Sequence, residues 1–321
     1  MHTLEKRYII ILIGFIILLS GCSSYFDQGK IQKAGMLAET SIHDQAWGAK
    51  GYKGLLAIRD KYDVDVYFKE GIKTEQDVAN AVDELVNHGV NLIFGHSSAY
   101  GKFFVDISQE YPDVQFVYFN GGYYADNVIS LNFNAHAMGY FGGMIAGKMT
   151  KTNQVAIVAA YEWQPEIEGF YEGVKYQNPD AEVHIDYVND WNDEKSALES
   201  FEKMRDVNAD VIYPAGDAFS SEMIKLASKD GIYAIGYVSD QSDIDKTAVL
   251  TSTVQHADKL YELIAKKFNK GELSGQILTF DFQDDAISLG RFSPVVPEEF
   301  QEKIKDAIDV YKKTGMLPNE R

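Results

Sequence analysis

The sequence predicts an α/β protein made of two doubly wound lobes with a central cleft. Three observations lead to this fold class. The 321-residue chain is long enough for two domains of ordinary size. Short apolar strands alternate with longer helical segments, which is typical of parallel sheets covered by helices. The same alternation starts a second time near residue 155, so we expect two lobes of similar construction.

The first lobe is predicted to hold residues 30–150 together with about 256–285. Its clearest helix start is Thr74, an N-cap residue that is followed three positions later by Asp77. In this lobe we expect strands at 31–37, 64–68, 90–94 and 114–119, and helices at 45–61, 74–87, 100–110, 134–149 and 257–270.

The second lobe is predicted to hold residues 151–250, and a C-terminal helix at 298–314 within 286–321 packs on the lobes. We expect strands at 155–159, 182–187, 211–213 and 232–237, and helices at 167–176, 194–207 and 220–229. A weak repeat supports the duplication, because segments 89–94 and 208–213 both follow a helix and precede an alanine-aromatic pair. The crossings between the lobes are expected near 150–154 and 250–255.

The N-terminus has the pattern of a lipoprotein export signal. Two basic residues precede an apolar run over residues 8–19, and small residues then lead to Cys22, the single cysteine of the chain. The run suits a signal-peptide core and is shorter than the ~20 residues that a membrane-spanning helix needs. The sequence Leu-Ser-Gly-Cys resembles the bacterial lipobox. This resemblance implies that residues 1–21 are removed, that Cys22 is lipidated, and that residues 22–29 tether the protein to the outer side of the cell membrane. A core helix with an incidental cysteine fits the short, charge-flanked run less well.

The composition narrows the partners of the chain. Its formal net charge is −18, and loss of the leader makes the chain one unit more negative. Such a surface repels polyanions and no basic cluster offsets it, so we expect no nucleic-acid partner. Because the one cysteine is assigned to lipidation, the folded part has no possible intramolecular disulfide and depends on its core for stability.

The sequence contains no complete motif for catalysis, for a metal site or for a cofactor site. Residues 142–149 nearly match a phosphate-binding P-loop, but Met149 takes the place of the Ser or Thr that coordinates magnesium. We expect instead a helix whose glycines permit close packing. The seven histidines lack metal-ligand spacing, and the chain has neither a Gly-x-Gly-x-x-Gly after its first strand nor a Gly-x-Ser-x-Gly elbow. We therefore expect a protein that is not an enzyme.

Several segments match one family in order along the mature chain. They are residues 31–37, 42–47, 140–149, 234–241 and 249–254. These segments resemble the basic membrane protein (BMP) lipoproteins, a family that includes nucleoside-binding lipoproteins of ABC importers. The resemblance implies the fold of type I periplasmic binding proteins. Residues 47–54, 213–217 and 237–243 are similar to a subgroup of bacillar lipoproteins that are regarded as positive regulators of competence.

The chain departs from the nucleoside binders at positions that the resemblance implies for the ligand. Asp44 matches the acid of the first loop, and Trp47 takes the place of the aromatic that stacks on the base. The ribose-binding acid of the family falls on Val238, and its basic partner falls on Gln255. A shift of the alignment by two makes Asp240 the acid instead. Charge-assisted bonds contribute about 1.5–3 kcal/mol each, so these changes predict weak nucleoside binding or a different ligand.

The cleft is expected at the carboxyl ends of the strands, where doubly wound folds bind ligands. Trp163 is a candidate to face Trp47 across the cleft, because paired aromatic rings suit planar ligands. The candidate ligand-binding residues are Asp44, Trp47, His96, Asn120, Trp163, Gly216, Asp217, Asp240 and Gln255. His96, which follows the expected strand at 90–94, is interpreted as a ligand contact or a loop residue rather than a general base.

The sequence is consistent with two functions. In the first, the protein is a surface lipoprotein that promotes competence and affects transcription indirectly, because an exported protein does not meet cytoplasmic DNA. In the second, it delivers nucleosides or another small solute to an ABC permease. The expected partners are the membrane through the lipid anchor, a nucleoside-like small molecule, and a permease or a membrane signalling protein.

Overall fold

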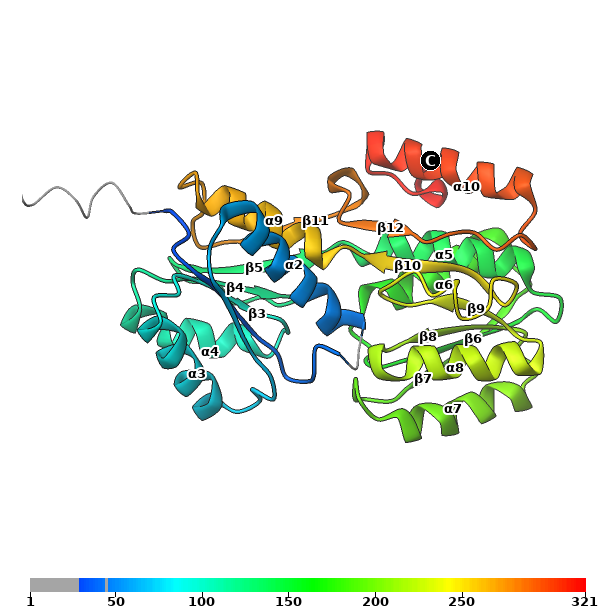
Figure 1. Cartoon of the computed structure of the whole chain (residues 1–321). Helices are drawn as coiled ribbons and strands as arrows, with labels where there is room; N and C mark the ends of the chain where they lie inside the picture. Colours follow the sequence, from blue (N-terminus) through cyan, green and yellow to red (C-terminus); the bar gives the residue numbers. More distant parts are fainter. Residues whose placement is uncertain (1–28, 44–45) are drawn as a thin grey trace, which may run out of the picture.

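The computed structural model describes residues 29–43 and 46–321, which form two α/β lobes lying side by side (Figure 1). The predicted export signal, Cys22 and Asp44 lie outside the described residues. Within the described part of the chain, no helix has both the length and the apolar character needed to cross a membrane.

Lobe 1 is built on a parallel six-stranded sheet with helices on both faces. Its strands are β1 (Ala34–Leu37), β2 (Val66–Lys69), β3 (Leu92–Gly95), β4 (Gln115–Phe119), β5 (Val128–Phe133) and β11 (Ile277–Phe280), in the order β11-β5-β4-β3-β1-β2. Helices α2 (Ala46–Tyr62) and α9 (Ala257–Phe268) pack together on one face, and α3 (Glu75–Asn87) and α4 (Tyr100–Ile107), extended by η1 (Ser108–Glu110), cover the other (Figure 1).

Lobe 2 repeats this construction on a second six-stranded sheet. Its strands are β6 (Gln154–Ala159), β7 (Glu182–Tyr187), β8 (Val211–Ala215), β9 (Tyr233–Gly236), β10 (Val249–Gln255) and β12 (Ile287–Leu289), in the order β12-β10-β9-β8-β6-β7. Strand β12 is antiparallel to β10, and the other pairs are parallel. Helices α5 (Ala135–Met149) and α6 (Pro165–Gln177) pack together, α7 (Glu194–Asp206) and α8 (Asp217–Asp230) pack together, and η2 (Phe282–Asp284), α10 (Glu298–Thr314) and η3 (Pro318–Glu320) complete the C-terminal part.

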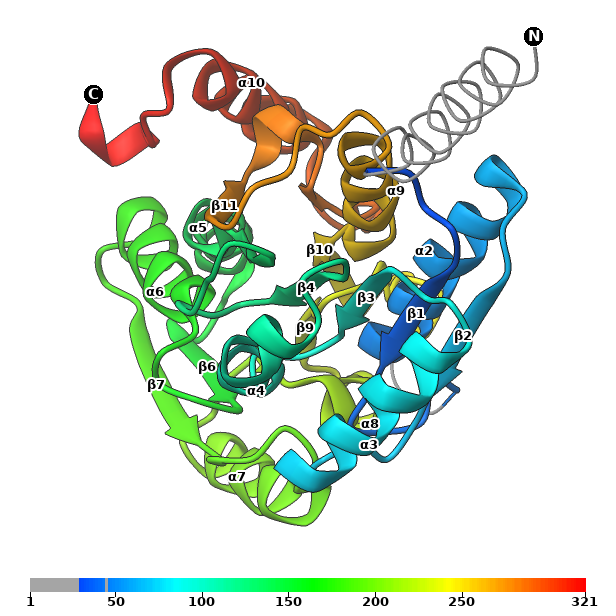
Figure 2. The ribbon, with the colours of Figure 1, turned by 90° about the vertical axis from the view of Figure 1, so that its left-hand side faces the viewer.

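The predicted fold class is confirmed, because both sheets have the same doubly wound strand order. The chain passes between the lobes three times, after β5, after β10 and between β11 and β12 (Figures 1 and 2). The structure thus differs from two boundaries expected from the sequence. Helix α5 packs on lobe 2 rather than lobe 1, which moves the first crossing from 150–154 to Asn134. Residues 250–255 belong to β10 and therefore to the lobe-2 sheet rather than to a connection.

Close packing of glycines explains why α5 belongs to lobe 2. A Cβ atom at Gly143 would lie 2.1 Å from the carbonyl oxygen of Phe170 on α6, and one at Gly173 would lie 1.9 Å from the carbonyl oxygen of Tyr140. The two helix backbones touch, and a side chain at either position would force them apart. The glycine-rich segment 142–149 is therefore part of a packed helix, as the sequence predicts.

Candidate functional site

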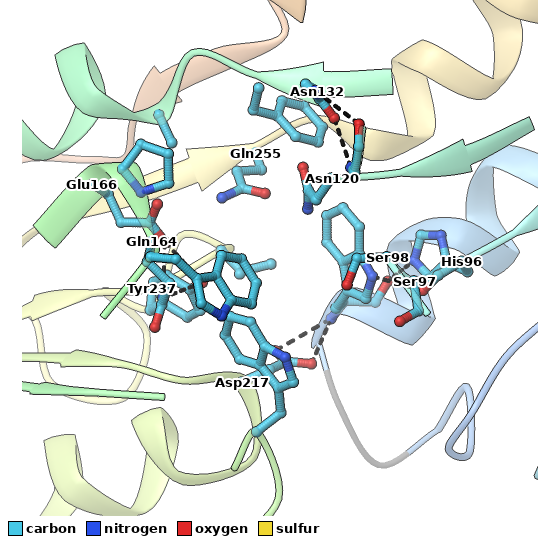
Figure 3. Close-up of a pocket in the computed structure, with 18 of the residues that line it drawn as sticks. His96, Ser97, Ser98, Asn120, Asn132, Gln164, Glu166, Asp217, Tyr237 and Gln255 are labelled. Atoms are coloured by element: carbon cyan, nitrogen blue, oxygen red, sulfur yellow. Dashed lines mark hydrogen bonds between the residues drawn. The ribbon is translucent and has the colours of Figure 1, made fainter. Parts of the chain in front are cut away.

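A cavity of about 410 Å³ lies between the lobes, at the carboxyl ends of the strands. This volume falls in the range of small-molecule sites. Six of the residues predicted from the sequence line it, from both lobes: Trp47, His96, Asn120, Trp163, Asp217 and Gln255. Figure 3 shows His96, Ser97 and Ser98 on one side of the pocket and Gln164, Glu166 and Tyr237 on the other.

Two other candidates lie outside this lining. The Asp240 carboxylate accepts a hydrogen bond from Arg291 Nε at 2.7 Å, and Asp240 does not line the cavity. Gly216 precedes α8, and the ring of Phe219 packs against it so closely that a Cβ atom would lie 2.0 Å from Phe219 Cζ. This position requires glycine for packing.

In lobe 1, Trp47 and His96 form one unit. Their rings stack with centroids 4.5 Å apart and planes 15° apart. His96 Nε2 donates to the carbonyl oxygen of Trp47 at 2.7 Å, and Trp47 Nε1 donates to the carbonyl oxygen of His96 at 3.0 Å. Because Nε2 carries the proton, Nδ1 accepts from the Tyr261 hydroxyl at 3.1 Å. Burial lowers the pKa of His96 to about 4, so the imidazole is neutral and acts to hold the indole in place.

In lobe 2, a buried hydrogen-bond network forms the wall of the cavity. Gln164 Nε2 donates to Glu166 Oε1 at 3.0 Å and to the Tyr237 hydroxyl at 3.1 Å. The same hydroxyl donates to Glu166 Oε1 at 3.0 Å, and Gln164 Nε2 also reaches the carbonyl oxygen of Ala215 at 3.1 Å. Burial raises the pKa of Glu166, which is 3 % exposed. The network fixes these side chains before any ligand enters.

Asp217 joins the two lobes across the cavity. It lies in the first turn of α8 in lobe 2, and its carboxylate accepts hydrogen bonds from the backbone N–H of Trp47, at 3.1 and 3.3 Å, in the first turn of α2 in lobe 1. Helix N-termini leave N–H groups without partners inside the helix, and an aspartate is a favoured acceptor for them. Burial raises the pKa of Asp217 to about 6. This contact, drawn as dashed lines from Asp217 in Figure 3, links the two lobes at the cavity.

All three tryptophans of the chain line the cavity. Trp47 comes from lobe 1, whereas Trp163 and Trp191 come from lobe 2, where their rings meet edge to face with centroids 5.8 Å apart. The ring of Tyr161 stacks on that of Trp163, with centroids 5.3 Å apart. Trp163 is 56 % exposed, which is high for an indole, and leaves apolar surface for a planar ligand.

The cavity wall also contains strained backbone. Val238 lines the cavity and has a φ of 62°, a left-handed conformation that β-branched residues rarely adopt. The Ser239 N–H donates to the carbonyl oxygen of Tyr237 at 2.7 Å, which closes a γ-turn centred on Val238. Strain of this kind clusters at ligand sites.

Sequence reasoning missed Glu39, Gln164, Glu166, Trp191 and Tyr237, all of which line the cavity. One signal was available: Pro165 directly followed by an acidic residue marks a helix N-terminus after a strand, and such ends face the ligand in this fold. The contacts among the other residues form only in the folded protein. Among the residues that the structure describes, no group of three or more His, Cys, Asp or Glu is placed to hold a metal ion.

Two doubly wound lobes around a cavity of aromatic and amide side chains define a solute-binding class of protein. Residues 31–321 match the family model Bmp, described as ABC transporter substrate-binding protein PnrA-like, and the chain belongs to this family.

Comparison with known proteins places the chain near a regulator. It is 49% identical to the transcriptional activator protein Med of Bacillus subtilis over 97% of this chain and 98% of that protein. The crystal structure of a transcriptional activator of the comK gene from Bacillus halodurans superposes with a TM-score of 0.83 and 46% identity, over 89% of this chain and 99% of that one. A purine-binding protein of Brucella abortus is 27% identical over 87% of this chain and 77% of that protein.

Proposed function

We propose that this chain is a membrane-anchored regulatory lipoprotein that binds a small molecule and promotes competence indirectly. The observation that carries the proposal is the contact between Asp217 and the start of α2, because it lies in the wall of the ligand cavity and joins the lobes. A ligand in the cavity acts on the same elements that hold the lobes together. Occupancy is thereby converted into a lobe arrangement that a membrane partner can read.

The likeness to Med supplies the competence part of this proposal. The export pattern ending at Cys22 supplies the anchor, and it explains why the action on transcription is indirect. The cavity lining supports binding without catalysis, because His96 is neutral and engaged with Trp47 and Tyr261.

The test is complementation of a Bacillus subtilis strain that lacks Med. We expect the full chain to restore expression of a comK reporter and transformation. Trp47→Ala, which removes the lobe-1 aromatic of the cavity, should reduce both by about tenfold or more. Tyr171→Ala serves as the matched control, since Tyr171 is an exposed aromatic on α6 outside the cavity lining.

A chain that begins at Ser23 and stays in the cytoplasm completes the test. It retains all described residues and lacks the export signal and Cys22. We expect it to be inactive at equal protein level, as measured by immunoblot. Full activity of this chain would contradict action from the membrane, and full activity of Trp47→Ala would contradict the role of the cavity.

The alternative function is delivery of a nucleoside or other solute to an ABC permease, which the family match favours. Val238 and Gln255, the positions at which the family resemblance implies an acid and a base for ribose, both line the cavity. If these two changes explain a loss of nucleoside binding, the double substitution Val238→Asp with Gln255→Lys should raise nucleoside affinity about tenfold or more in a calorimetric titration. An unchanged affinity would show that these two positions did not set the specificity.

A further inference from the structure

The charge-bearing side chains in the described lining of the cavity are acidic. Its described lining includes Glu39, Glu166 and Asp217 and contains no lysine or arginine. Lys50, whose charge acts on Asp217, lies one turn further along α2 and outside the lining, and burial lowers its pKa. Phosphate and carboxylate ligands are commonly held by arginine and lysine. The cavity lacks these side chains.

The helix N-termini at the cavity also have acidic side chains of the protein beside them. Such ends attract anions, because their N–H groups point outward and the helix dipole is positive there. The first turn of α6 carries Glu166, and the first turn of α8 carries Asp217. The Asp217 carboxylate also accepts the N–H of Trp47 in the first turn of α2. An incoming anion therefore meets a carboxyl group of the protein at each of these three ends.

Gln255 points to a ligand independently of the charges. It is 5 % exposed and lines the cavity, and within the described part of the chain its side-chain amide has no hydrogen-bond partner. Figure 3 shows this amide extending toward the open centre of the pocket, on the side of Asn120. The amide is accessible from the cavity, so a ligand that supplies a donor or an acceptor gains a hydrogen bond with a side chain that is already in place.

The aromatic rings define the shape of that ligand. Trp47 lines the cavity from lobe 1 while His96 stacks on one of its faces, and Trp163 and Trp191 line it from lobe 2. Indole faces bind planar rings, and they also attract cations placed over them. Aromatic rings, carboxylates and an absent basic group together favour a ligand that is both planar and positively charged.

We propose that the cavity binds a planar aromatic ligand that carries positive charge and no phosphate or carboxylate, and that Glu39 and Asp217 set this charge preference. This inference rests on the proposed function, because it names the chemical class of the ligand in the same cavity.

Four related probes test it near neutral pH: adenosine, N6-methyladenosine, 1-methyladenosine and AMP. 1-Methyladenosine is a cation under these conditions, whereas N6-methyladenosine carries the same added methyl group and is neutral. AMP adds a phosphate. The chain from Ser23 contains all described residues and is used for the titrations. Its intrinsic tryptophan fluorescence reports on the cavity, because all three tryptophans line it.

We expect 1-methyladenosine to bind at least about tenfold tighter than N6-methyladenosine, and AMP at least about tenfold weaker than adenosine. Glu39→Gln should reduce the preference for the cation several-fold. Glu162→Gln is the matched control, since Glu162 is exposed beside Trp163 and does not line the cavity.

Three results would overturn the inference: AMP binding as tightly as adenosine, no preference for 1-methyladenosine over its neutral isomer, or no binding of any probe up to about 1 mM. The complementation experiment decides the proposed function separately. If competence depends on Trp47 and the charge preference is absent, the proposed function stands and this inference fails. If competence does not depend on Trp47, the proposed function fails whatever the probes show.

Discussion

The two lobes share a strand order, yet they contribute different kinds of surface to the cavity. In lobe 2, Gln164, Glu166 and Tyr237 are buried and bonded to one another. In lobe 1, the main feature is one indole, Trp47, held by the neutral imidazole of His96. Lobe 2 is a preformed half-site. Lobe 1 brings an aromatic ring whose helix, α2, is tied to lobe 2 through Asp217.

The two lobes of this duplicated fold therefore have different roles at the cavity. Gln164, Glu166 and Tyr237 satisfy one another inside lobe 2, so their arrangement does not depend on closure. The group that closure positions is an indole, which tolerates water when the cleft is open.

Separating α5 from α6 in lobe 2 should cause the largest loss of stability. Gly143→Ala places a Cβ atom 2.1 Å from the Phe170 carbonyl oxygen, so α5 and α6 must separate. We expect a loss of about 3 kcal/mol in the free energy of unfolding, measured in urea. Gly142→Ala is the matched control on the same helix, because its Cβ atom meets only side-chain atoms, at 3.5 Å or more. It should be neutral or stabilising by about 1 kcal/mol, and equal losses in both variants would contradict the packing account.

Lowering the pH should change the contributions of His96 in lobe 1 and Asp217 in lobe 2 to the free energy of unfolding in opposite directions. The pKa of His96 in the folded protein is lowered to about 4, so the unfolded chain binds a proton first as the pH falls below 6.5, and stability is lost between pH 6.5 and 4. The expected loss is about 3 kcal/mol. His256 acts in the same direction. The pKa of Asp217 is raised to about 6, so the folded protein binds this proton first and the carboxyl offsets part of the loss as the pH falls from 6 to 4.

Two variants separate these contributions in urea unfolding at several pH values. His96→Phe removes the imidazole, and we expect a flatter dependence of stability on pH between 6.5 and 4. Asp217→Asn removes the carboxyl titration but keeps a capping oxygen, and we expect a steeper dependence. The same slope in both variants and the parent protein would show that neither group is buried as described.

Removing one hydroxyl from each lobe should have a smaller effect that is greater in lobe 2. Tyr237→Phe deletes the donor to Glu166 and the acceptor of Gln164, which leaves buried polar groups with fewer partners. We expect a loss of about 2 kcal/mol. Tyr261→Phe deletes a single bond, to His96 Nδ1, and should cost about 1 kcal/mol. A larger loss in Tyr261→Phe would reverse the comparison of the lobes.

Much of the fold was predictable because it depends on local patterns. The Thr74 signal is confirmed as a capping box, in which the Thr74 hydroxyl accepts the Asp77 N–H at 3.2 Å and the Asp77 carboxylate accepts the Thr74 N–H at 3.1 Å. Strand β5, and the short strands β11 and β12 that follow α9, were not predicted. Strand β10 was taken for a connection, because its Thr and Ser residues are polar in sequence although the strand is wholly buried.

The placement of α5 and part of the site depended on contacts that local sequence does not contain. Nearly all residues of α5 are buried, so no polar face shows which sheet it covers. Trp47 and Gln255 were selected through the family resemblance and Trp163 as an aromatic partner for Trp47, and all three line the cavity. Tyr237 was not selected as a site residue, because its role arises from bonds to side chains far away in sequence.

If Asp217 couples the cavity to the lobe arrangement, its removal should change the distance between the lobes. The chain from Ser23 has no cysteine, so Glu75→Cys on α3 and Lys195→Cys on α7 give one exposed spin-label site on each lobe. Double electron–electron resonance should show a narrow distance distribution in this background and in Asp217→Asn, which keeps the capping oxygen. Asp217→Ala should shift it to longer and broader distances. An unchanged distribution in Asp217→Ala would show that Asp217 does not hold the lobes in this arrangement.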